Sequence, residues 1–295
     1  MKKLILSLGA LFLYSCLLDA SVSIIPVPQK CIEKKGSFIL NKETVINLSI
    51  DDEGMRDAVA IWNDLLATAA GFKLEIAPPR SSNVIRCHIN PSFPNEEAYK
   101  LKVTPSSIQI EAKTSRGVFY AFQTLRQLMP PAIEQADKVE EEFVWKVPCV
   151  IIEDMPSFSY RGIMLDVSRH FMPKEVVKRC IDLMAFHKLN TFHWHLTDDQ
   201  GWRIEIKKYP KLTSVGGFRD KTITGHVRNK PYQWNMKRYG GFYTQEDVKE
   251  IVAYAKKRFV EIIPEIEMPG HSMAALAAYP EYSCTGGPFE VEGRW

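Results

Sequence analysis

The sequence lacks the cysteine spacing of a zinc knuckle or a disulfide framework, and it lacks the basic runs of a nucleic-acid-binding protein. Six cysteines occur among 295 residues, and no two of them have C-x-x-C spacing. Without that spacing, and with an odd number of five cysteines left if Cys16 is lipidated, we expect neither a disulfide framework nor a zinc knuckle. Most of the cysteines should be small buried side chains. Lys and Arg outnumber Asp and Glu by only 38 to 35. No long basic run or basic-aromatic stripe is present, and we expect no nucleic-acid partner.

Only one segment is apolar enough to approach a membrane, and it lies at the N-terminus. Two lysines precede an apolar run over 4–13, which is too short to span a bilayer and is typical of an export signal within residues 1–20. Two cleavage sites compete: a lipobox-like Leu13-Tyr14-Ser15-Cys16, which would lipidate Cys16, and ordinary cleavage after Ala20. We expect an exported protein, periplasmic, outer-membrane-anchored or extracellular, with a lipid on Cys16 as its only membrane contact.

Residues 21–155 have the pattern of an α+β domain. Apolar residues recur at helical spacing from Met55 to Ala69, Gly71 follows as a stop, and a second helical pattern ends at Pro130-Pro131. Short strand-like runs surround these helices, at 44–50, 72–76, 84–89, 99–103 and 108–112. This order favours one antiparallel or mixed sheet with helices on a single face. No acid, base and nucleophile gather here, so we interpret the segment as an accessory domain.

From residue 156 the pattern changes to alternating strands and helices. Strand patterns occur at 160–167, 191–197 and 260–266. Parallel strands with right-handed crossovers are the usual result of this order, so we expect an incomplete α/β barrel of the TIM type over 156–295. A doubly wound sheet is the alternative, but no glycine-rich phosphate turn follows the first strand.

Local signals place the ends of the helices between these strands. Pro173 is suited to the first turn of one helix, and Asn190 is expected to close it in the left-handed conformation. Thr244 and Asp247 form a capping box for the next helix. The connection 198–243 is long, which is typical of a functional loop.

Polar clusters follow all three expected strands, at 166–170, 193–199 and 265–271. Barrel active sites form at the carboxyl ends of the strands, so three clusters at one face favour a site. His193 and His195 project to the same face of a strand, as a zinc pair would. No third and fourth ligand with clear spacing accompanies them, and a hydrogen-bonded interior pair is the competing interpretation.

Several side chains in these clusters suit a neutral polyhydroxylated substrate without a metal or cofactor. Arg169 can donate to two hydroxyls, and Asp198 and His271 can form a hydrogen-bonded pair. Because adjacent residues that leave a strand usually diverge, at most one of Asp198 and Asp199 should face the site. Trp202 either stacks on a sugar or anchors the loop.

The string Tyr-Arg-Gly-Ile-Met-Leu-Asp-Val-Ser-Arg-His-Phe at 160–171 resembles the opening barrel strand of glycoside hydrolase family 20, the β-N-acetylhexosaminidases. Residues 190–205 and 263–271 are similar to its second and third strands, and 108–125 resemble its accessory domain. The resemblance therefore extends over nearly all of the chain after the export signal.

The resemblance implies removal of terminal non-reducing N-acetylglucosamine or N-acetylgalactosamine from β-linked glycans. The mechanism is substrate-assisted and retaining, because the acetamido oxygen of the sugar replaces an enzyme nucleophile. Arg169 matches the arginine that holds the outer hydroxyls of the sugar. Asp198 matches an aspartate that hydrogen-bonds a histidine, and His271 matches that histidine, which supports the general acid. His195 belongs to the second-strand motif and is given only a structural role.

The family's catalytic pair is not found in this sequence. In a motif like H-x-G-G-D-E, an Asp orients the acetamido group and a Glu protonates the leaving oxygen. Gly286-Gly287 is instead followed by Pro288. Roughly 140 residues of barrel are present, where about 250 are typical. We therefore identify no catalytic residue, expect a fragment, and expect this chain by itself to be inactive. A non-catalytic sugar-binding protein is the alternative.

Overall fold

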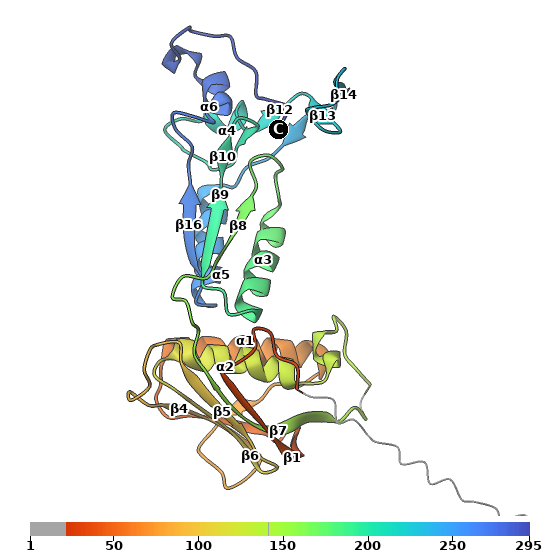
Figure 1. The fold of residues 1–295 in the computed structure, drawn as a ribbon, viewed down its shortest axis with the longest axis vertical. Helices are drawn as coiled ribbons and strands as arrows, with labels where there is room; N and C mark the ends of the chain where they lie inside the picture. The colour runs from red at the N-terminus through yellow and green to blue at the C-terminus, as the bar shows by residue number, and fades with distance from the viewer. Residues whose placement is uncertain (1–21, 141) are drawn as a thin grey trace, which may run out of the picture.

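The computed structural model describes residues 22–140 and 142–295, which form two parts stacked along the long axis of the molecule (Figure 1). The expected export signal, with Cys16, lies outside the described residues. Within the described ranges, no helix is both long and apolar enough to cross a membrane.

The N-terminal part is built on a mixed seven-stranded sheet in the order β1-β7-β5-β6-β4-β2-β3. The pairs among β2, β3, β4 and β6 are parallel, and the pairs that join β1, β7, β5 and β6 are antiparallel. The strands are β1 (Lys30–Leu40), β2 (Val45–Leu48), β3 (Glu75–Ile76), β4 (Val84–Ile89), β5 (Tyr99–Val103), β6 (Ser107–Ala112) and β7 (Trp145–Asp154). A mixed sheet is one of the two arrangements that the sequence predicts.

Two helices, α1 (Glu53–Ala69) and α2 (Ser115–Leu128), cover the face of this sheet that is directed toward the other part (Figure 1). The Asp52 carboxylate accepts the backbone N–H of Met55 at 2.9 Å, which caps the start of α1. Trp62 and Phe122 join the two helices with their ring centroids 5.6 Å apart. A short 3₁₀ helix, η1 (Pro131–Glu134), follows α2.

The C-terminal part is built on a parallel sheet in the order β16-β9-β8. These strands are β8 (Gly162–Asp166), β9 (Thr191–His195) and β16 (Glu261–Glu265), and α3 (Lys174–Phe186) and α5 (Gln245–Lys256) make the crossovers. Val177, Ile181 and Ile251 bury the apolar faces of the helices against Trp194 of β9. All three strands point away from the N-terminal part, so their carboxyl ends lie at the far end of the molecule (Figure 1).

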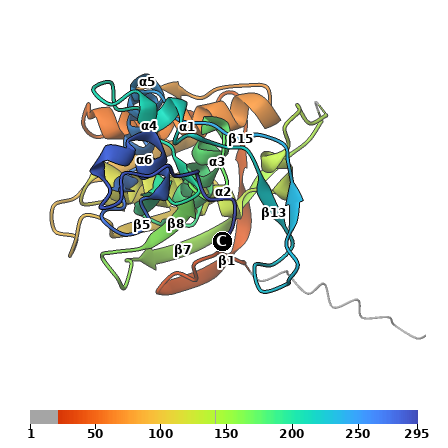
Figure 2. The same cartoon turned by 90° about the horizontal axis from the view of Figure 1, so that it is seen from above.

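The long connection after β9 folds over these carboxyl ends. It contains β10 (Thr197–Asp198), β11 (Gly201–Trp202), α4 (Lys211–Ser214), β12 (Phe218–Arg219), β13 (Thr222–Thr224), β14 (Gln233–Asn235) and β15 (Tyr239–Gly240). After β16 come α6 (Met273–Ala278) and the 3₁₀ helix η2 (Pro280–Tyr282). From the side and from above, α6 and the β13–β14 hairpin lie on opposite sides of the strand ends (Figures 1 and 2).

A polar network joins the two parts. The Arg161 guanidinium, just before β8, donates to both oxygens of Glu97 at 2.8 and 2.9 Å. The Asn190 amide also donates to Glu97, at 3.2 Å. This bidentate pair links the start of the parallel sheet to the segment before β5.

Two details of the fold differ from the sequence predictions. The residue after α3 in the left-handed conformation is Lys188, with φ of 59°, and not Asn190. The Asn190 side chain instead accepts the backbone N–H of Arg161 at 3.0 Å, so this residue serves the junction and not the helix end. Strands β1 and β7 were not predicted. Most of β1 is exposed, and its charged run Glu33-Lys34-Lys35 has no apolar alternation.

Candidate functional site

The last paired residues of the three parallel strands lie at one level of the sheet. In the strand register, His195 of β9 is opposite Asp166 of β8 on one side and Glu265 of β16 on the other. Each strand therefore ends in a titratable residue at the carboxyl edge. The site extends from this level into the loops that follow the strands.

Asp198 is at the centre of the site and is only 1% exposed. Its Oδ2 atom lies 2.6 Å from Nη2 of Arg169 and 3.1 Å from Nε2 of His195. Its Oδ1 atom lies 3.1 Å from Nδ1 of His271 and accepts the backbone N–H of Asp199 at 2.7 Å. The structure thus brings together all three residues that the sequence analysis singled out, Arg169, Asp198 and His271, around one buried carboxylate.

Arg169 is held by the turn that follows β8. The Asp166 Oδ1 atom accepts the backbone N–H groups of Ser168 and Arg169, both at 3.0 Å, and this is the geometry of an Asx turn. The other oxygen of Asp166 lies 2.8 Å from Nη1 of Arg169. The guanidinium is therefore clamped between two carboxylates, yet its side chain keeps 29% exposure. It can still donate to a ligand above the strand ends.

Two buried arginines fix the backbone around Arg169. Arg203 is fully buried and donates to the carbonyl oxygens of Ser168 and Gly217, each at 2.6 Å. Burial, assisted by the charge of Arg219, lowers the pKa of Arg203 to about 10. Arg219 is also buried, and its Nη1 donates to the carbonyl oxygen of Arg169 at 2.9 Å. Sequence reasoning assigned neither residue a role, because their partners are backbone carbonyls that no motif reveals.

His271 is the most open member of the group. Its Nδ1 atom faces Asp198, its φ is 50°, and its side chain is 58% exposed. Among residues 22–140 and 142–295, no hydrogen bond or ion pair involves its Nε2 atom. A carboxylate on Nδ1 fixes the tautomer and orientation of the ring. The Nε2 side can therefore interact with a further group above the site.

Asp198 and Asp199 both approach Nδ1 of His271 but differ in their other partners, so the expected divergence of these adjacent residues is only partial. The Asp199 Oδ1 atom accepts the backbone N–H of Met273 at 3.0 Å, which satisfies the first turn of α6. Its Oδ2 atom lies 3.6 Å from Nδ1 of His271. Asp199 therefore connects the loop after β9 to the segment that carries His271.

Trp202 anchors the loop. It is 5% exposed, its indole N–H donates to the carbonyl oxygen of Ile204 at 2.8 Å, and it packs with Leu212 and Ala274. Of the two roles considered from the sequence, the structure supports loop anchoring over stacking on a sugar.

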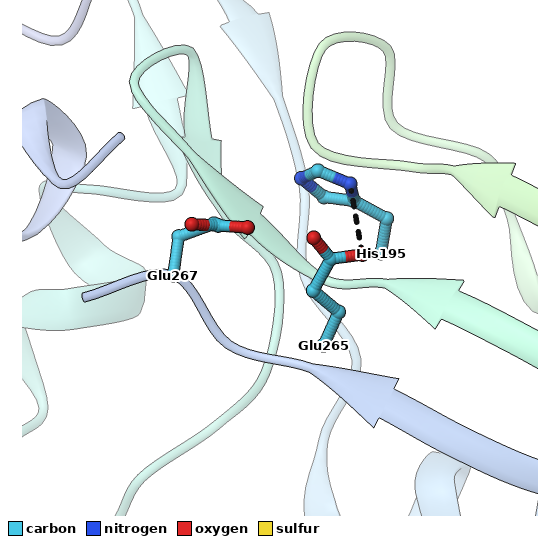
Figure 3. A group of neighbouring side chains, drawn as sticks. All are labelled: His195, Glu265 and Glu267. Carbon is cyan, nitrogen blue, oxygen red and sulfur yellow. Dashed lines mark ion pairs between the residues drawn. The ribbon is translucent and has the colours of Figure 1, made fainter. Parts of the chain in front are cut away.

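Sequence reasoning gave no role to two carboxylates of the site, Glu265 and Glu267, and assigned His195 a structural role only. Figure 3 shows the three side chains together, with the ion pair between His195 and Glu265 marked by a dashed line. The Glu265 Oε2 atom lies 3.2 Å from Nδ1 of His195 and also contacts Nε2 of His193. The His195 ring therefore has a carboxylate at each nitrogen, Glu265 on one side and Asp198 on the other. The H-x-H spacing predicted that both rings lie on one face of the strand. No sequence pattern identified Glu265 as their partner.

The two glutamates interact, and their pKa values shift in opposite directions. The hydrogen bond with Glu267 and the nearby His195 lower the pKa of Glu265. The same hydrogen bond, with burial and the charge of Glu265, raises the pKa of Glu267. The pKa values of two close carboxylates separate in this way because only one of the two groups ionises easily. Glu265 is thus the ionised partner, and Glu267 retains the proton to higher pH.

Two groups of side chains have the composition of a cation site. His195, Glu265 and Glu267 offer ligand atoms within 4.8 Å of one another, and so do Asp198, Asp199 and His271. The metal alternative considered from the sequence paired His193 with His195, but His193 belongs to neither group. In the first group Oε2 of Glu265 is buried without a hydrogen-bond partner among the described residues, whereas in the second group Asp198 and His271 are hydrogen-bonded to each other.

The comparisons with known proteins agree with this architecture. Residues 158–294 match the family model described as glycosyl hydrolase family 20, catalytic domain, and residues 21–155 match domain 2 of that family. A beta-hexosaminidase of Porphyromonas gingivalis is 42% identical over 280 residues, which cover 94% of this chain and 34% of that protein.

Solved structures show the same similarity. The beta-N-acetylhexosaminidase from Streptomyces coelicolor A3(2) superimposes with a TM-score of 0.80 at 35% identity, over 92% of this chain and 51% of that one. The corresponding enzyme from Bacteroides fragilis gives a TM-score of 0.72 at 32% identity, over 92% of this chain and 50% of that one. The chain spans about a third of the length of the Porphyromonas protein and about half of each solved chain.

Proposed function

This chain belongs to glycosyl hydrolase family 20, and on that premise we propose that the protein containing it removes terminal non-reducing N-acetylhexosamine from β-linked glycans. The ligand class is a glycan that ends in N-acetylglucosamine or N-acetylgalactosamine. The similar proteins named above are beta-hexosaminidases, and both parts of the chain match domains of their family.

We propose a substrate-assisted, retaining mechanism. The acetamido oxygen of the sugar attacks the anomeric carbon while an acid protonates the leaving oxygen. In this scheme Arg169 donates to the outer hydroxyls of the terminal sugar. Asp198 and His271 support the acid, because Asp198 fixes Nδ1 of His271 and leaves its Nε2 side toward the site.

The observation that carries the proposal is the convergence of Arg169 and His271 on the buried carboxylate of Asp198. These groups come from the ends of three successive parallel strands, the positions where a barrel places its active site. An arginine held between carboxylates recognises hydroxyls by position, and a histidine fixed at Nδ1 interacts through Nε2.

The chain itself supplies binding and supporting groups. The Gly-Gly-Asp-Glu pattern of the catalytic pair does not occur in its 295 residues. We therefore assign the orientation of the acetamido group and the protonation of the leaving oxygen to groups outside these residues. It follows that this chain alone should not turn over substrate.

The test is a kinetic comparison on the intact protein that contains the chain. An aryl β-N-acetylglucosaminide should be hydrolysed with retention, and the matching aryl β-glucoside, which has a 2-hydroxyl in place of the acetamido group, should not. Replacing the N-acetyl group by N-trifluoroacetyl should slow the reaction, because its carbonyl oxygen is a weaker nucleophile. Equal rates on the acetamido and hydroxyl substrates would contradict the mechanism.

We also propose that the protein is exported, with Cys16 as the candidate site of lipid attachment. The support is the sequence of residues 1–20 alone: two lysines, a short apolar run and the lipobox-like Leu13-Tyr14-Ser15-Cys16. A glycan substrate with terminal amino sugars is consistent with action outside the cytoplasm.

A further inference from the structure

We propose that the β13–β14 hairpin is a second recognition surface, which binds acidic sugar units of the glycan whose terminal residue enters the site described above. The ligand chemistry is a sulfate ester or a carboxylate on the sugars that follow the terminal N-acetylhexosamine. The inference rests on the proposed function for the identity of the glycan, and it adds the class of substrate that the hairpin selects.

The first argument is the distribution of charge. Residues 221–240, the hairpin segment, contain five Lys or Arg side chains and no Asp or Glu, whereas the whole chain has 38 basic and 35 acidic residues. The five are Lys221, Arg228, Lys230, Lys237 and Arg238. This short segment therefore carries more positive charge than the net charge of the entire chain, which is +3.

Three of these cations have no carboxylate partner in the part of the chain that the structure describes. The side chains of Arg228, Lys230 and Lys237 are exposed, and none has a carboxylate oxygen of a described residue within 4.0 Å. The other two cations pair with Glu290 at 2.9 Å and Asp220 at 3.8 Å. Like charges grouped in a short hairpin repel one another, and a bound anion removes that repulsion.

Two aromatic rings of the hairpin hold part of this charge in place. Tyr232 and Trp234 have their ring centroids 6.1 Å apart. The ammonium group of Lys230 lies 5.8 Å from the Tyr232 centroid, and that of Lys221 lies 5.4 Å from the Trp234 centroid. A cation at such a distance over a ring is attracted to the ring face. The hairpin therefore positions two ammonium groups with its own neighbouring side chains.

The base of the hairpin is attached to the turn that carries Arg169. Arg219 of β12 is opposite Tyr239 of β15 in the strand register. Arg219 donates to the carbonyl oxygen of Arg169 at 2.9 Å, and the Tyr239 hydroxyl donates to that of Phe171 at 3.0 Å. The hairpin consequently lies at the same end of the molecule as the carboxyl ends of the parallel strands (Figures 1 and 2).

This position favours the glycan itself as the source of the anion. A glycan whose terminal residue is held by Arg169 must lead its following sugars out past the loops around the strand ends, and the hairpin is one of these loops. Lys and Arg form charge-assisted hydrogen bonds with oxyanions. Contacts between exposed charges act mainly on specificity and weaken with salt. The hairpin should therefore lower KM for acidic glycans, most clearly at low salt, and leave the chemical step unchanged.

The experiment replaces the three unpaired cations together in the intact protein, as Arg228→Gln, Lys230→Gln and Lys237→Gln. On a neutral aryl N-acetylglucosaminide, kcat/KM should stay within about twofold of the parent. On a β-linked oligosaccharide whose terminal N-acetylhexosamine is followed by sulfated or uronic acid units, KM should rise at least about threefold with kcat unchanged. A neutral oligosaccharide of the same length should show no such rise. The sulfated and the uronic acid substrates, assayed separately, distinguish the two anions.

The matched control combines Lys34→Gln, Lys35→Gln and Lys102→Gln. It changes the net charge by the same amount, at exposed residues of the accessory domain. This control should behave like the parent on every substrate.

A variant that conserves charge tests the hairpin without removing its cations. Arg228→Lys, Lys230→Arg and Lys237→Arg, combined, should keep the lower KM for the acidic oligosaccharide.

A second readout does not depend on activity. Titration of the parent with dextran sulfate, which contains no amino sugar, should show binding that weakens at least about threefold in the hairpin variant and not in the control variant. Neutral dextran should not bind.

Equal effects of the hairpin and control variants would overturn the proposal, because net charge alone would then explain them. So would an equal rise of KM on the acidic and neutral oligosaccharides, or a hairpin variant that is equally impaired on the aryl substrate. Loss of binding to vesicles of anionic phospholipid, with an unchanged KM for the acidic oligosaccharide, would show that the hairpin faces a membrane instead. If the parent hydrolyses no hexosaminide, the proposed function fails, and the dextran sulfate titration still decides whether the hairpin binds acidic glycans.

Discussion

Lys188 and Asp154 form a buried ion pair across the junction between the two parts of the molecule. The Lys188 Nζ atom lies 2.9 Å from Oδ2 of Asp154, and the side chains are 3% and 11% exposed. The hydroxyl of Tyr99 completes the contact at 2.8 Å from the same ammonium. Burial lowers the pKa of Lys188, whereas the charge of Asp154 and its hydrogen bond act in the opposite direction and favour the ammonium. The accessory domain therefore stabilises the end of α3 and the start of β9.

Removing the ammonium should destabilise the protein strongly. Lys188→Met leaves the Asp154 carboxylate buried without its cation, which costs about 3–5 kcal/mol when a buried pair is broken. Adding Asp154→Asn should restore part of that loss, because the remaining charge is then gone. Urea unfolding of the intact protein measures both variants.

The matched control for this pair is on the surface. Lys30 and Glu153 lie 3.2 Å apart with exposures of 49% and 41%. Lys30→Met should change the free energy of unfolding by less than about 1 kcal/mol. Equal losses for Lys30→Met and Lys188→Met would show that the junction pair contributes no more than a surface contact.

Replacing Arg169 should impair catalysis in the intact protein. Arg169→Ala removes a donor to the sugar and a charged partner of Asp198. The transition-state stabilisation, as calculated from kcat/KM, should therefore fall by about 2–4 kcal/mol. Arg169→Lys should recover little, since an ammonium cannot reproduce the fork held by Asp166 and Asp198. Steady-state kinetics on an aryl N-acetylglucosaminide decide; a kcat/KM within about threefold of the parent would remove Arg169 from the site.

The elements that the sequence predicted well are those with local signals. The capping box at Thr244 and Asp247 is present, with the Thr244 hydroxyl accepting the Asp247 N–H at 3.1 Å. Strands β4 and β5 match the predicted runs because their apolar residues alternate. The positions of Arg169, Asp198 and His271 also followed from local order, since each lies just after a strand with a clear pattern.

The features that the sequence did not predict depend on contacts between distant segments. The partnership of His195 with Glu265 arises from the register of two strands that are 70 residues apart in the chain. The roles of Arg203 and Arg219 depend on carbonyl groups from several loops. Strand β1 has few buried side chains, so its place at the edge of the sheet is decided by pairing with β7 and not by its own pattern.

Asp247 should make the stability of the protein depend on pH in the acid range. Its hydrogen bonds from Thr244 and Lys174 lower its pKa from 3.8 to about 2. As the pH falls from 3.8 toward 2, the unfolded chain binds the proton first, so the stabilisation from the carboxylate is lost in that window. Because this group is largely solvated, we expect an effect below about 1 kcal/mol.

The measurement compares parent and Asp247→Asn in urea at several pH values. The parent should be the more stable near pH 6, and most of the difference should be lost as the pH falls from 3.8 to 2. Asp220→Asn, at a residue whose side chain is 91% exposed, provides the control. A difference between parent and Asp247→Asn that is constant over this range would contradict the assignment.

Export can be tested independently of activity. When the gene is expressed in a bacterial host, mass spectrometry of the mature N-terminus should show a lipid-modified Cys16. Cys16→Ser should then release the protein from the membrane fraction without preventing export. A mature N-terminus at Ser21 without lipid would contradict the anchoring proposal and leave export intact.

A polypeptide limited to these 295 residues should not hydrolyse an aryl N-acetylglucosaminide. The mechanism needs one group to polarise the acetamide and another to protonate the leaving oxygen, and the site built from Arg169, Asp198 and His271 contains neither. In the described residues β8 and β16 each pair along one edge only, and Ile163 and Ile263 are 44% and 41% exposed. Unpaired edges and uncovered apolar side chains make this part prone to proteolysis and aggregation, whereas the seven-stranded sheet has its own core.

Trypsin should therefore cleave within 156–295 and leave a resistant fragment that corresponds to 22–155. Because an inactive sample is also the result of misfolding, the digestion pattern must be recorded on the same preparation as the assay. A resistant accessory domain with no turnover is the expected outcome. Turnover close to that of a complete family member, from a monomeric sample, would mean that the catalytic residues lie within this chain and have been misassigned.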